Sequence, residues 1–291
     1  MKIAVAAYQM DELASFEAYA EKIECWVADA AADLLVFPEY GAMELATLSG
    51  RAGELEASLH AVSDLMEEAD ALHARLASSY GCHILAASGP VFDGDGANGR
   101  PVNRSRLFSP SGASAQQDKQ IMTRFERETW DVVPGGPLCV FDTALGRIGV
   151  LICYDAEFPL LGRALVEAGA EILLVPSCTD SLHGWNRVRV GAMARALEGQ
   201  CIAVQAPTVG ACPWSPAVDE NHGAAAIYGP PDLGFPEDGV FAQGKLDAAG
   251  WTRAEIDMGL VARVRAQGAQ HNARHWPEQA PRAVAKEVQL R

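Results

Sequence analysis

The sequence predicts an α/β protein built as a four-layer α-β-β-α sandwich. The chain has 291 residues, of which 49% are apolar, and this provides enough material for one large core. Each half of the chain alternates strand and helix patterns and then continues into a run of strands. Two sheets that each carry helices on one side can bury their bare faces against each other, which gives four layers.

In the first half, short apolar runs predict strands over 2–8, 34–37, 83–87, 102–108 and 113–118. Apolar residues at helical spacing predict helices over 15–31 and about 54–79. The Gly- and Asp-rich stretch 93–99 predicts a hairpin turn. A calcium loop is not expected there, because Arg104 stands where such a loop needs an acid.

In the second half, the same criteria predict strands over 147–152, 171–175, 201–206, 223–228 and 239–244. Helices are predicted over 159–169 and about 186–198. We therefore expect residues 1–265 to form one domain. Residues 266–291 are polar with few apolar anchors, so they predict a C-terminal arm or tail that is disordered or packed on a partner subunit.

Composition narrows the classes of partner and compartment. The formal charge of −15 and the pI of about 4.8 argue against binding to nucleic acid or to an anionic membrane surface. No apolar run reaches membrane-spanning length. The 7 cysteines are scattered and contain no CxxC pair, which argues against a disulfide framework or a zinc site and predicts a reducing cytoplasm.

Cys153 stands where a buried strand turns into a helix. The preceding residues are apolar and rich in β-branched side chains, and Pro159 suits the first turn of the helix that follows. A nucleophile at such a turn is presented at the end of the sheet, with free backbone N–H groups behind it that can bind an oxyanion. The alternative is a buried structural cysteine, which is common in strands.

Glu39 and Lys119 also follow predicted strands, and Glu126 and Glu128 come soon after the lysine. A buried carboxylate can take the proton of a thiol and later return it to a departing amine. A nearby ammonium group can stabilise the thiolate and the developing oxyanion. The alternative for Lys119 and its neighbouring acids is a solvated surface pair. No histidine stands at a comparable position for the role of base.

Three segments resemble the nitrilase, or carbon-nitrogen hydrolase, superfamily in its amidase-like branch. They are Val36-Phe37-Pro38-Glu39, the stretch from Asp118-Lys119 to Glu126-Arg127-Glu128, and Gly149-Val150-Leu151-Ile152-Cys153-Tyr154-Asp155-Ala156-Glu157-Phe158-Pro159. With supporting motifs elsewhere, the resemblance covers about residues 1–265. It implies the nitrilase-type α-β-β-α sandwich, in a homodimer or higher oligomer formed through the helical faces.

The resemblance also implies roles for individual residues. Glu39 corresponds to the general base and acid, Lys119 to the oxyanion stabiliser and Cys153 to the nucleophile. Glu126 fits the family's second catalytic glutamate better than Glu128 does. In the family mechanism, the cysteine attacks an amide carbonyl, the N–H of Tyr154 helps to hold the oxyanion, and a thioester forms and is hydrolysed. No metal or organic cofactor is implied.

Four positions are candidates for substrate binding: Tyr154, Glu157, Trp130 and Trp185. Glu157 stands where many family amidases carry arginine, which suggests that an anionic substrate tail is disfavoured and a neutral or cationic amide is accepted. Alternatively, Glu157 pairs with Arg187, Arg189 or Arg195 and does not meet substrate. The tryptophans either line the pocket or only pack. Cys178 follows another strand and is expected to be a bystander.

The sequence therefore predicts a cysteine-dependent amidase that hydrolyses a small non-peptide amide to a carboxylic acid and ammonia. The alternatives are an acyltransferase, in which another nucleophile replaces water, a nitrile hydrolase, or a non-catalytic binding module. Nitrile hydrolysis is disfavoured because nitrilases commonly have Trp after the nucleophile, where this chain has Tyr154. The expected partners are the substrate and a second copy of the chain, without nucleic acid or membrane.

Overall fold

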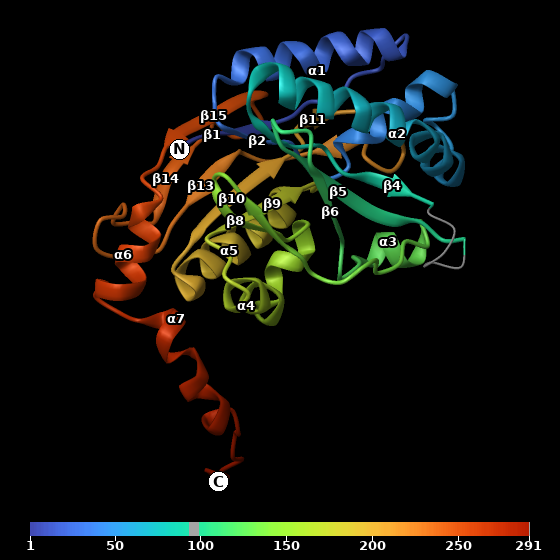
Figure 1. Ribbon diagram of the computed structural model, residues 1–291. Helices are drawn as coiled ribbons and strands as arrows, with labels where there is room; N and C mark the ends of the chain where they lie inside the picture. The colour runs from blue at the N-terminus through green and yellow to red at the C-terminus, as the bar shows by residue number, and fades with distance from the viewer. Residues whose placement is uncertain (93–98, 291) are drawn as a thin grey trace.

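The computed structural model describes residues 1–92 and 99–290. Two sheets lie face to face, and helices cover the outer face of each (Figure 1). This arrangement confirms the predicted four-layer α-β-β-α sandwich. The turn predicted over 93–99 lies, apart from its last residue, outside the described residues.

The first sheet contains β1 (Lys2–Ala7), β2 (Leu34–Val36), β3 (His83–Leu85), β4 (Gly89–Val91), β5 (Val102–Phe108), β6 (Ser114–Asp118) and β15 (Gly250–Glu255). In space the order is β15-β1-β2-β3-β5-β4, with β6 paired to β5. The strands β1, β2 and β3 are parallel, whereas β15 runs antiparallel to β1. The hairpin of β5 and β6 confirms the strand pair predicted before Lys119.

The second sheet contains β7 (Val140–Thr143), β8 (Gly146–Val150), β9 (Ile172–Ser177), β10 (Ile202–Pro207), β13 (Ala226–Tyr228) and β14 (Val240–Gln243). Its order is β14-β13-β10-β9-β8-β7, and β8, β9 and β10 are parallel. A small separate ribbon pairs β11 (Gly210–Ala211) with β12 (Glu220–Asn221). Each large sheet therefore has a parallel centre with antiparallel strands beside it.

The helices are α1 (Phe16–Ala30), α2 (Leu55–Tyr80), α3 (Arg124–Glu128), α4 (Pro159–Glu167), α5 (Leu182–Gly199), α6 (Gly259–Gln267) and α7 (Asn272–His275). The 3₁₀ helices are η1 (Gly41–Ser49), η2 (Cys153–Glu157) and η3 (Trp276–Arg282). Figure 1 shows α1 and α2 over the first sheet, and α4 and α5 over the second.

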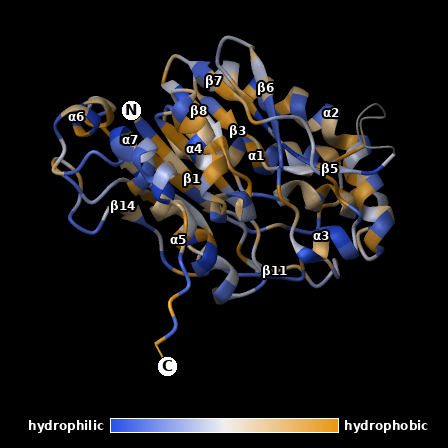
Figure 2. Ribbon diagram, turned by 90° about the horizontal axis from the view of Figure 1, so that it is seen from below, coloured by the Kyte–Doolittle hydropathy of each residue, from blue (hydrophilic) through white to orange (hydrophobic). Residues whose placement is uncertain are grey.

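Two hydrophobic cores hold the layers together. Because side chains alternate along a strand, Ile3 and Val5 of β1 pack with the apolar residues of the second sheet. Ala4 and Ala6 instead join the core beneath α1 and α2. Figure 2 shows hydrophobic residues concentrated in the central strands. The parallel strands are buried on both faces, which explains their continuous apolar runs.

The topology places several strand ends at one edge of the sandwich. The carboxyl ends of the parallel strands in both sheets point to this edge, where the loops after them meet. A bridge between Tyr8 and Thr208 joins the ends of β1 and β10 across the two sheets. Glu39, Cys153 and Cys178 each follow one of these strands.

Some elements differ from those predicted. The patterns did not predict β4, β7, β15 or α6. β15 was missed because it is an edge strand with half-buried apolar and charged residues and therefore no clear alternation. α5 begins earlier than predicted, at Leu182, because the hydroxyl of Ser181 accepts a hydrogen bond from Gly184 N at 3.3 Å and caps the helix.

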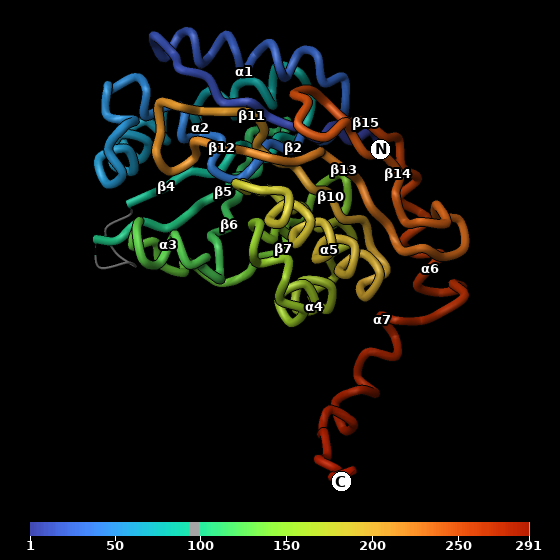
Figure 3. Tube along the Cα trace, turned by 180° about the vertical axis from the view of Figure 1, so that it is seen from behind, coloured from blue at the N-terminus to red at the C-terminus, as the bar shows by residue number. Residues whose placement is uncertain are grey.

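The C-terminal segment projects from the sandwich in two opposite views (Figures 1 and 3). α6 spans residues on both sides of the predicted boundary at 265, and α7 and η3 contain no buried residue. The arm is attached through Arg163, which donates to the Ala273 carbonyl and lies over the ring of Trp276. Within the described residues, no helix has both the length and the apolar character needed to cross a membrane.

The helix α5 packs closely against η2 at Gly191, and a substitution there tests this contact. A Cβ at Gly191 would lie 2.8 Å from the carbonyl oxygen of Ala156. Gly191→Ala should therefore lower the free energy of unfolding by about 1–3 kcal/mol, as overpacking does, when measured by urea denaturation. His183→Ala, at an exposed position of the same helix, is the control and should change it by less than about 0.5 kcal/mol. Equal stability of the two variants would contradict this packing.

Candidate active site

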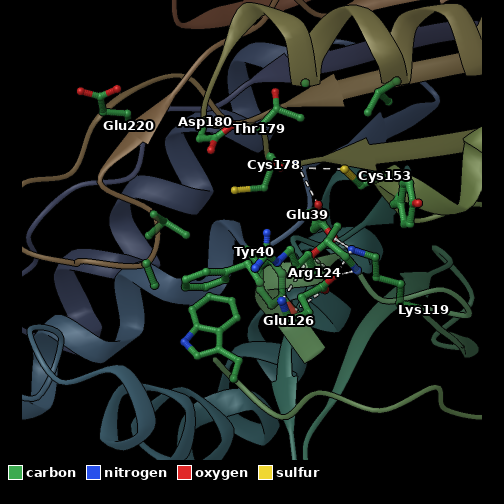
Figure 4. A pocket seen from close by; sticks show the side chains of 18 of the residues that line it. Glu39, Tyr40, Lys119, Arg124, Glu126, Cys153, Cys178, Thr179, Asp180 and Glu220 are labelled. Carbon is green, nitrogen blue, oxygen red and sulfur yellow. Dashed lines mark hydrogen bonds and ion pairs between the residues drawn. The ribbon is translucent and has the colours of Figure 1, made fainter. Parts of the chain in front are cut away.

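A cavity of about 490 Å³ opens at the edge where the strand ends meet. Glu39, Lys119, Glu126 and Cys153 all line it, although they come from distant parts of the chain. Figure 4 shows Glu39, Lys119 and Glu126 grouped together, with Cys153 beside them. The structure thus brings together all four residues that the sequence singled out for catalysis.

Cys153 begins η2 directly after the end of β8. It has a φ of 52°, in the left-handed region that residues other than glycine rarely adopt. The turn buries the residue to 4% exposure but leaves it at the cavity wall. The prediction of a strand-to-helix turn is therefore right in outline, with one correction: the 3₁₀ helix η2 precedes α4.

Lys119 forms the centre of a buried charge cluster. It follows β6, and its side chain is only 1% exposed. Its Nζ donates to Glu39 Oε1 at 2.7 Å and to Glu126 Oε2 at 2.7 Å. Because three buried charges share these contacts, the surface-pair alternative for Lys119 is wrong.

Glu126 is held by more donors than Glu39. It lies in the first turn of α3, where it forms a capping box with Thr123. The N–H and the hydroxyl of Thr123 both donate to Glu126 Oε2 at 2.8 Å. The hydroxyl of Tyr40 donates to the other oxygen at 2.8 Å. Glu128, the rejected candidate, instead forms an exposed ion pair with Arg124.

The two glutamates differ in the direction of their pKa shifts. Burial raises the pKa of the Glu39 carboxyl above its ordinary 4.5, and Lys119 opposes this only in part. Burial acts in the same direction on Glu126, but Lys119 and the hydrogen bonds from Thr123 and Tyr40 outweigh it and lower its pKa. When the surroundings separate the pKa values of two carboxyl groups in this way, the two groups can perform different tasks in a reaction. Glu39 is suited to exchange protons, whereas Glu126 is suited to remain an anion.

The thiol and the ammonium group are also shifted. Burial raises the pKa of Cys153 well above 9.0, the neighbouring Glu39 charge raises it further, and Lys119 lowers it. The resting side chain is therefore a thiol that needs a base. Burial alone would lower the pKa of Lys119, but the carboxylates of Glu126 and Glu39 raise it well above 10.5. Lys119 consequently remains a cation throughout the neutral pH range.

Cys178 and Asn103 also contact the catalytic residues, and the sequence did not predict these contacts. The backbone N–H of Cys178 donates to Glu39 Oε2 at 3.0 Å, and its carbonyl accepts from the Cys153 thiol at 3.8 Å. Asn103 Nδ2 donates to Glu39 Oε1 at 3.0 Å. Cys178 was expected to be a bystander, but its main chain contacts both base and nucleophile. Its position just after β9 was the available signal.

The candidate substrate-binding residues divide into two groups. Tyr154, Glu157 and Trp130 line the cavity. Trp185 is a correction, because it is not among the described residues that line the cavity. Its indole N–H instead donates to the carbonyl of Ala224 at 3.3 Å, and the ring packs within the fold.

Glu157 forms an ion pair with an arginine, which was the alternative prediction for this residue. Arg187 forms two hydrogen bonds with its carboxylate, one of them from Nε to Oε1 at 3.1 Å. Both residues line the cavity. Glu157 therefore contributes to the wall as part of a neutral pair. In the described part of the chain, no group of three or more His, Cys, Asp or Glu side chains is arranged to hold a metal ion.

Known proteins with related sequences include hydrolases. The chain is 32% identical over 272 residues to the Bacillus subtilis (strain 168) protein named "Probable hydrolase YhcX", covering 92% of this chain and 52% of that protein. It is 37% identical over 142 residues to the deaminated glutathione amidase of Bos taurus, covering 48% and 40%. The chain thus spans about half the length of the curated relatives that it matches, or less.

Solved structures support the fold. A carbon-nitrogen hydrolase from Helicobacter pylori G27 matches with a TM-score of 0.72 at 20% sequence identity, covering 95% of this chain and 92% of that one. A family model described as carbon-nitrogen hydrolase matches residues 4–266. This match spans both sheets and every residue of the buried cluster. The chain therefore belongs to the carbon-nitrogen hydrolase family.

Proposed function

We propose that this chain is an amidase that converts a small non-peptide amide to a carboxylic acid and ammonia through a thioester on Cys153. One observation carries the proposal: a buried thiol, a carboxyl with a raised pKa and a permanent ammonium group meet in one cavity. These are the groups that nucleophilic attack on an amide requires. The amidase among the related sequences supports the same reaction class.

In the first half-reaction, Glu39 takes the proton of the Cys153 thiol as the sulfur attacks the amide carbonyl carbon. The carbonyl electrons move onto oxygen, where the Lys119 ammonium and the N–H of Tyr154 stabilise the negative charge. When the carbon–nitrogen bond breaks, Glu39 gives its proton to the departing nitrogen. Ammonia leaves, and the acyl group remains on sulfur as a thioester.

In the second half-reaction, water takes the place of ammonia. Glu39 accepts a proton from the water as its oxygen attacks the thioester carbonyl, and the same oxyanion site is used again. The carbon–sulfur bond then breaks, the carboxylic acid is released and the proton returns to sulfur. Glu126 exchanges no proton in this scheme. Its fixed charge keeps Lys119 protonated and in place.

We further propose that the cavity accepts neutral or cationic amides in preference to anionic ones. Asp180, Asp219 and Glu220 line the cavity, and none of them forms an ion pair with any described residue. Figure 4 shows Asp180 and Glu220 on the side away from Lys119. Uncompensated carboxylates repel an anionic substrate tail and attract a cationic one. Glu157 is already paired with Arg187. We therefore attribute the preference against anionic amides to Asp180, Asp219 and Glu220 instead of Glu157.

We also propose that the chain acts as a homodimer in a reducing cytoplasm. All seven cysteines are free, which supports that compartment. On the outer helices, Leu160 of α4 is 74% exposed and Val190 of α5 is 63% exposed. Apolar side chains exposed on neighbouring helices support an interface there. The C-terminal arm projects from the same side of the sandwich in Figure 1 and would extend such an interface.

Ammonia release from a panel of small amides tests the reaction. The wild-type chain should release ammonia from at least one amide. Cys153→Ala should lower the rate by about 10⁴-fold or more, and Glu39→Gln by roughly 10²–10⁴-fold, as loss of a general base does. Cys25→Ser, on the exposed face of α1, is the control and should retain the wild-type rate.

The same assay separates the alternative functions. Formation of a hydroxamate in the presence of hydroxylamine at the expense of the acid would favour acyl transfer. Turnover of nitriles alone would favour a nitrile hydrolase. Activity that survives in Cys153→Ala would rule out the thioester route.

The pH profile tests the task assigned to Glu39. As base, this carboxyl must be ionised, so activity should be lost as the pH falls. Because its pKa is raised above 4.5, kcat/KM should begin to fall at a pH above that value. A profile that remains flat down to about pH 4 would contradict the assignment. The residual activity of Glu39→Gln should lack this acidic limb.

A matched substrate series tests the charge preference. Butanamide, 4-aminobutanamide and succinamic acid share a four-carbon chain and differ in the charge at its far end. We expect kcat/KM to be lower for the anionic member by about tenfold or more. The triple variant Asp180→Asn, Asp219→Asn, Glu220→Gln should reduce the difference in kcat/KM between the anionic substrate and the other two. Added salt should reduce it as well. Faster turnover of succinamic acid than of the other two would contradict the preference.

A further inference from the structure

Asp155 is a buried carboxylate that the reaction scheme does not use. It is 1% exposed and lies two residues after the nucleophile. It is not among the described residues that line the cavity, so a substrate in the cavity does not contact it. Burial of a carboxylate is unfavourable unless its oxygens are fully hydrogen-bonded. Its hydrogen bonds therefore indicate what the residue does.

All of these hydrogen bonds come from backbone N–H groups of two chain segments. Ile121 N donates to Asp155 Oδ1 at 2.8 Å, and Gln120 N lies 3.2 Å from both carboxylate oxygens. On the other side, Ile152 N donates to Oδ2 at 3.2 Å. One donor segment directly follows Lys119, and the other directly precedes Cys153. The carboxylate therefore joins the two segments that carry the oxyanion stabiliser and the nucleophile.

Among the residues that the structure describes, no other hydrogen bond joins residues 119–121 to residues 152–155. The backbone N–H of Lys119 is bonded to the carbonyl of Asn103 in the first sheet, whereas Cys153 follows a strand of the second sheet. Lys119 Nζ contacts the two glutamates, which also belong to the first-sheet side of the cavity. The two halves also meet where Glu39 accepts from the N–H of Cys178, but Asp155 forms the hydrogen-bonded link between the backbone next to Lys119 and the backbone next to Cys153.

We propose that Asp155 is a positioning residue that fixes the Lys119 ammonium relative to the Cys153 sulfur through the backbone of Gln120 and Ile121. This inference deepens the proposed function and rests on it. Displacement of a catalytic group by about 1 Å is enough to lower a rate about 10²-fold. An amide at this position can accept hydrogen bonds from some of the three backbone N–H groups but presents its own N–H donors to the others, so one segment must move.

A simpler role is that Asp155 only stabilises η2. The two roles differ in whether the effect of Asp155 depends on Lys119. A residue that acts through Lys119 has nothing left to position once the ammonium is removed, whereas a residue that only stabilises the turn has the same effect in either background. A double-mutant cycle measures this difference.

The experiment compares the wild-type chain with Asp155→Asn, Lys119→Ala and the double variant. Two readouts are used: kcat and KM on an amide that the wild type hydrolyses, and the rate at which iodoacetamide alkylates Cys153. We expect Asp155→Asn to lower kcat by about 10–100-fold with KM changed by less than about threefold, and to slow alkylation. In the Lys119→Ala background, the additional effect of Asp155→Asn should be less than about twofold on each readout that remains measurable.

Glu44→Gln is the matched control. Glu44 is equally buried and accepts a hydrogen bond from the backbone N–H of Asp11 at 3.0 Å, but it does not line the cavity. Its substitution should lower the melting temperature and leave kcat and alkylation within about twofold of the wild type. If Asp155→Asn does not fold, Asp155→Glu replaces it, because a carboxylate displaced by one methylene should show the same dependence on Lys119.

Two results would overturn the inference: a wild-type kcat in folded Asp155→Asn, or an equal loss in both backgrounds. Failure of the proposed function is a separate result. If the wild-type chain hydrolysed no amide, the amidase proposal would fail, while the alkylation cycle would still show whether Asp155 acts through Lys119.

Discussion

The site depends on one interaction, the buried contact of the Lys119 ammonium with two carboxylates. One cation between two anions leaves an excess negative charge in a buried place, which is unfavourable unless other donors compensate. The donors are distributed unequally: Glu126 receives the N–H and the hydroxyl of Thr123 and the hydroxyl of Tyr40, whereas Glu39 receives one N–H each from Asn103 and Cys178. Glu39 therefore remains the carboxyl that can exchange a proton with the thiol beside it.

The fold makes this cluster possible because two parallel sheet centres end at the same edge. Each strand end delivers one group: Glu39 after β2, Cys153 after β8, and the backbone of Cys178 after β9. Lys119 arrives from the hairpin of β5 and β6. At this edge the nucleophile Cys153 is held at a positive φ, a conformation that persists only where the surrounding structure imposes it. At the same edge, the Asp155 carboxylate has its proposed role between the segments next to Lys119 and Cys153.

Much of this arrangement could be predicted from the sequence. The apolar strand patterns predicted the sandwich, which the structure confirms. The family motifs singled out Glu39, Lys119, Glu126 and Cys153, and the structure places all four around one cavity. β15 could not be predicted, because an edge strand has weak alternation and its partner β1 lies at the other end of the chain. The ion pair of Glu157 with Arg187 was only one of three candidates, because pairing across elements depends on side-chain geometry. The position of Trp185 behind the cavity wall depends on packing in the same way.

The central claim is that an acyl group is transferred to the Cys153 sulfur within this cluster. It is tested most directly by acid-quenching the enzyme during turnover of an amide, followed by intact-protein and peptide mass spectrometry. A thioester on Cys153 predicts a mass increase equal to the acyl group, located on the peptide that contains Cys153 and sensitive to hydroxylamine. An acyl adduct on a different residue, or turnover that continues in Cys153→Ala, would contradict it.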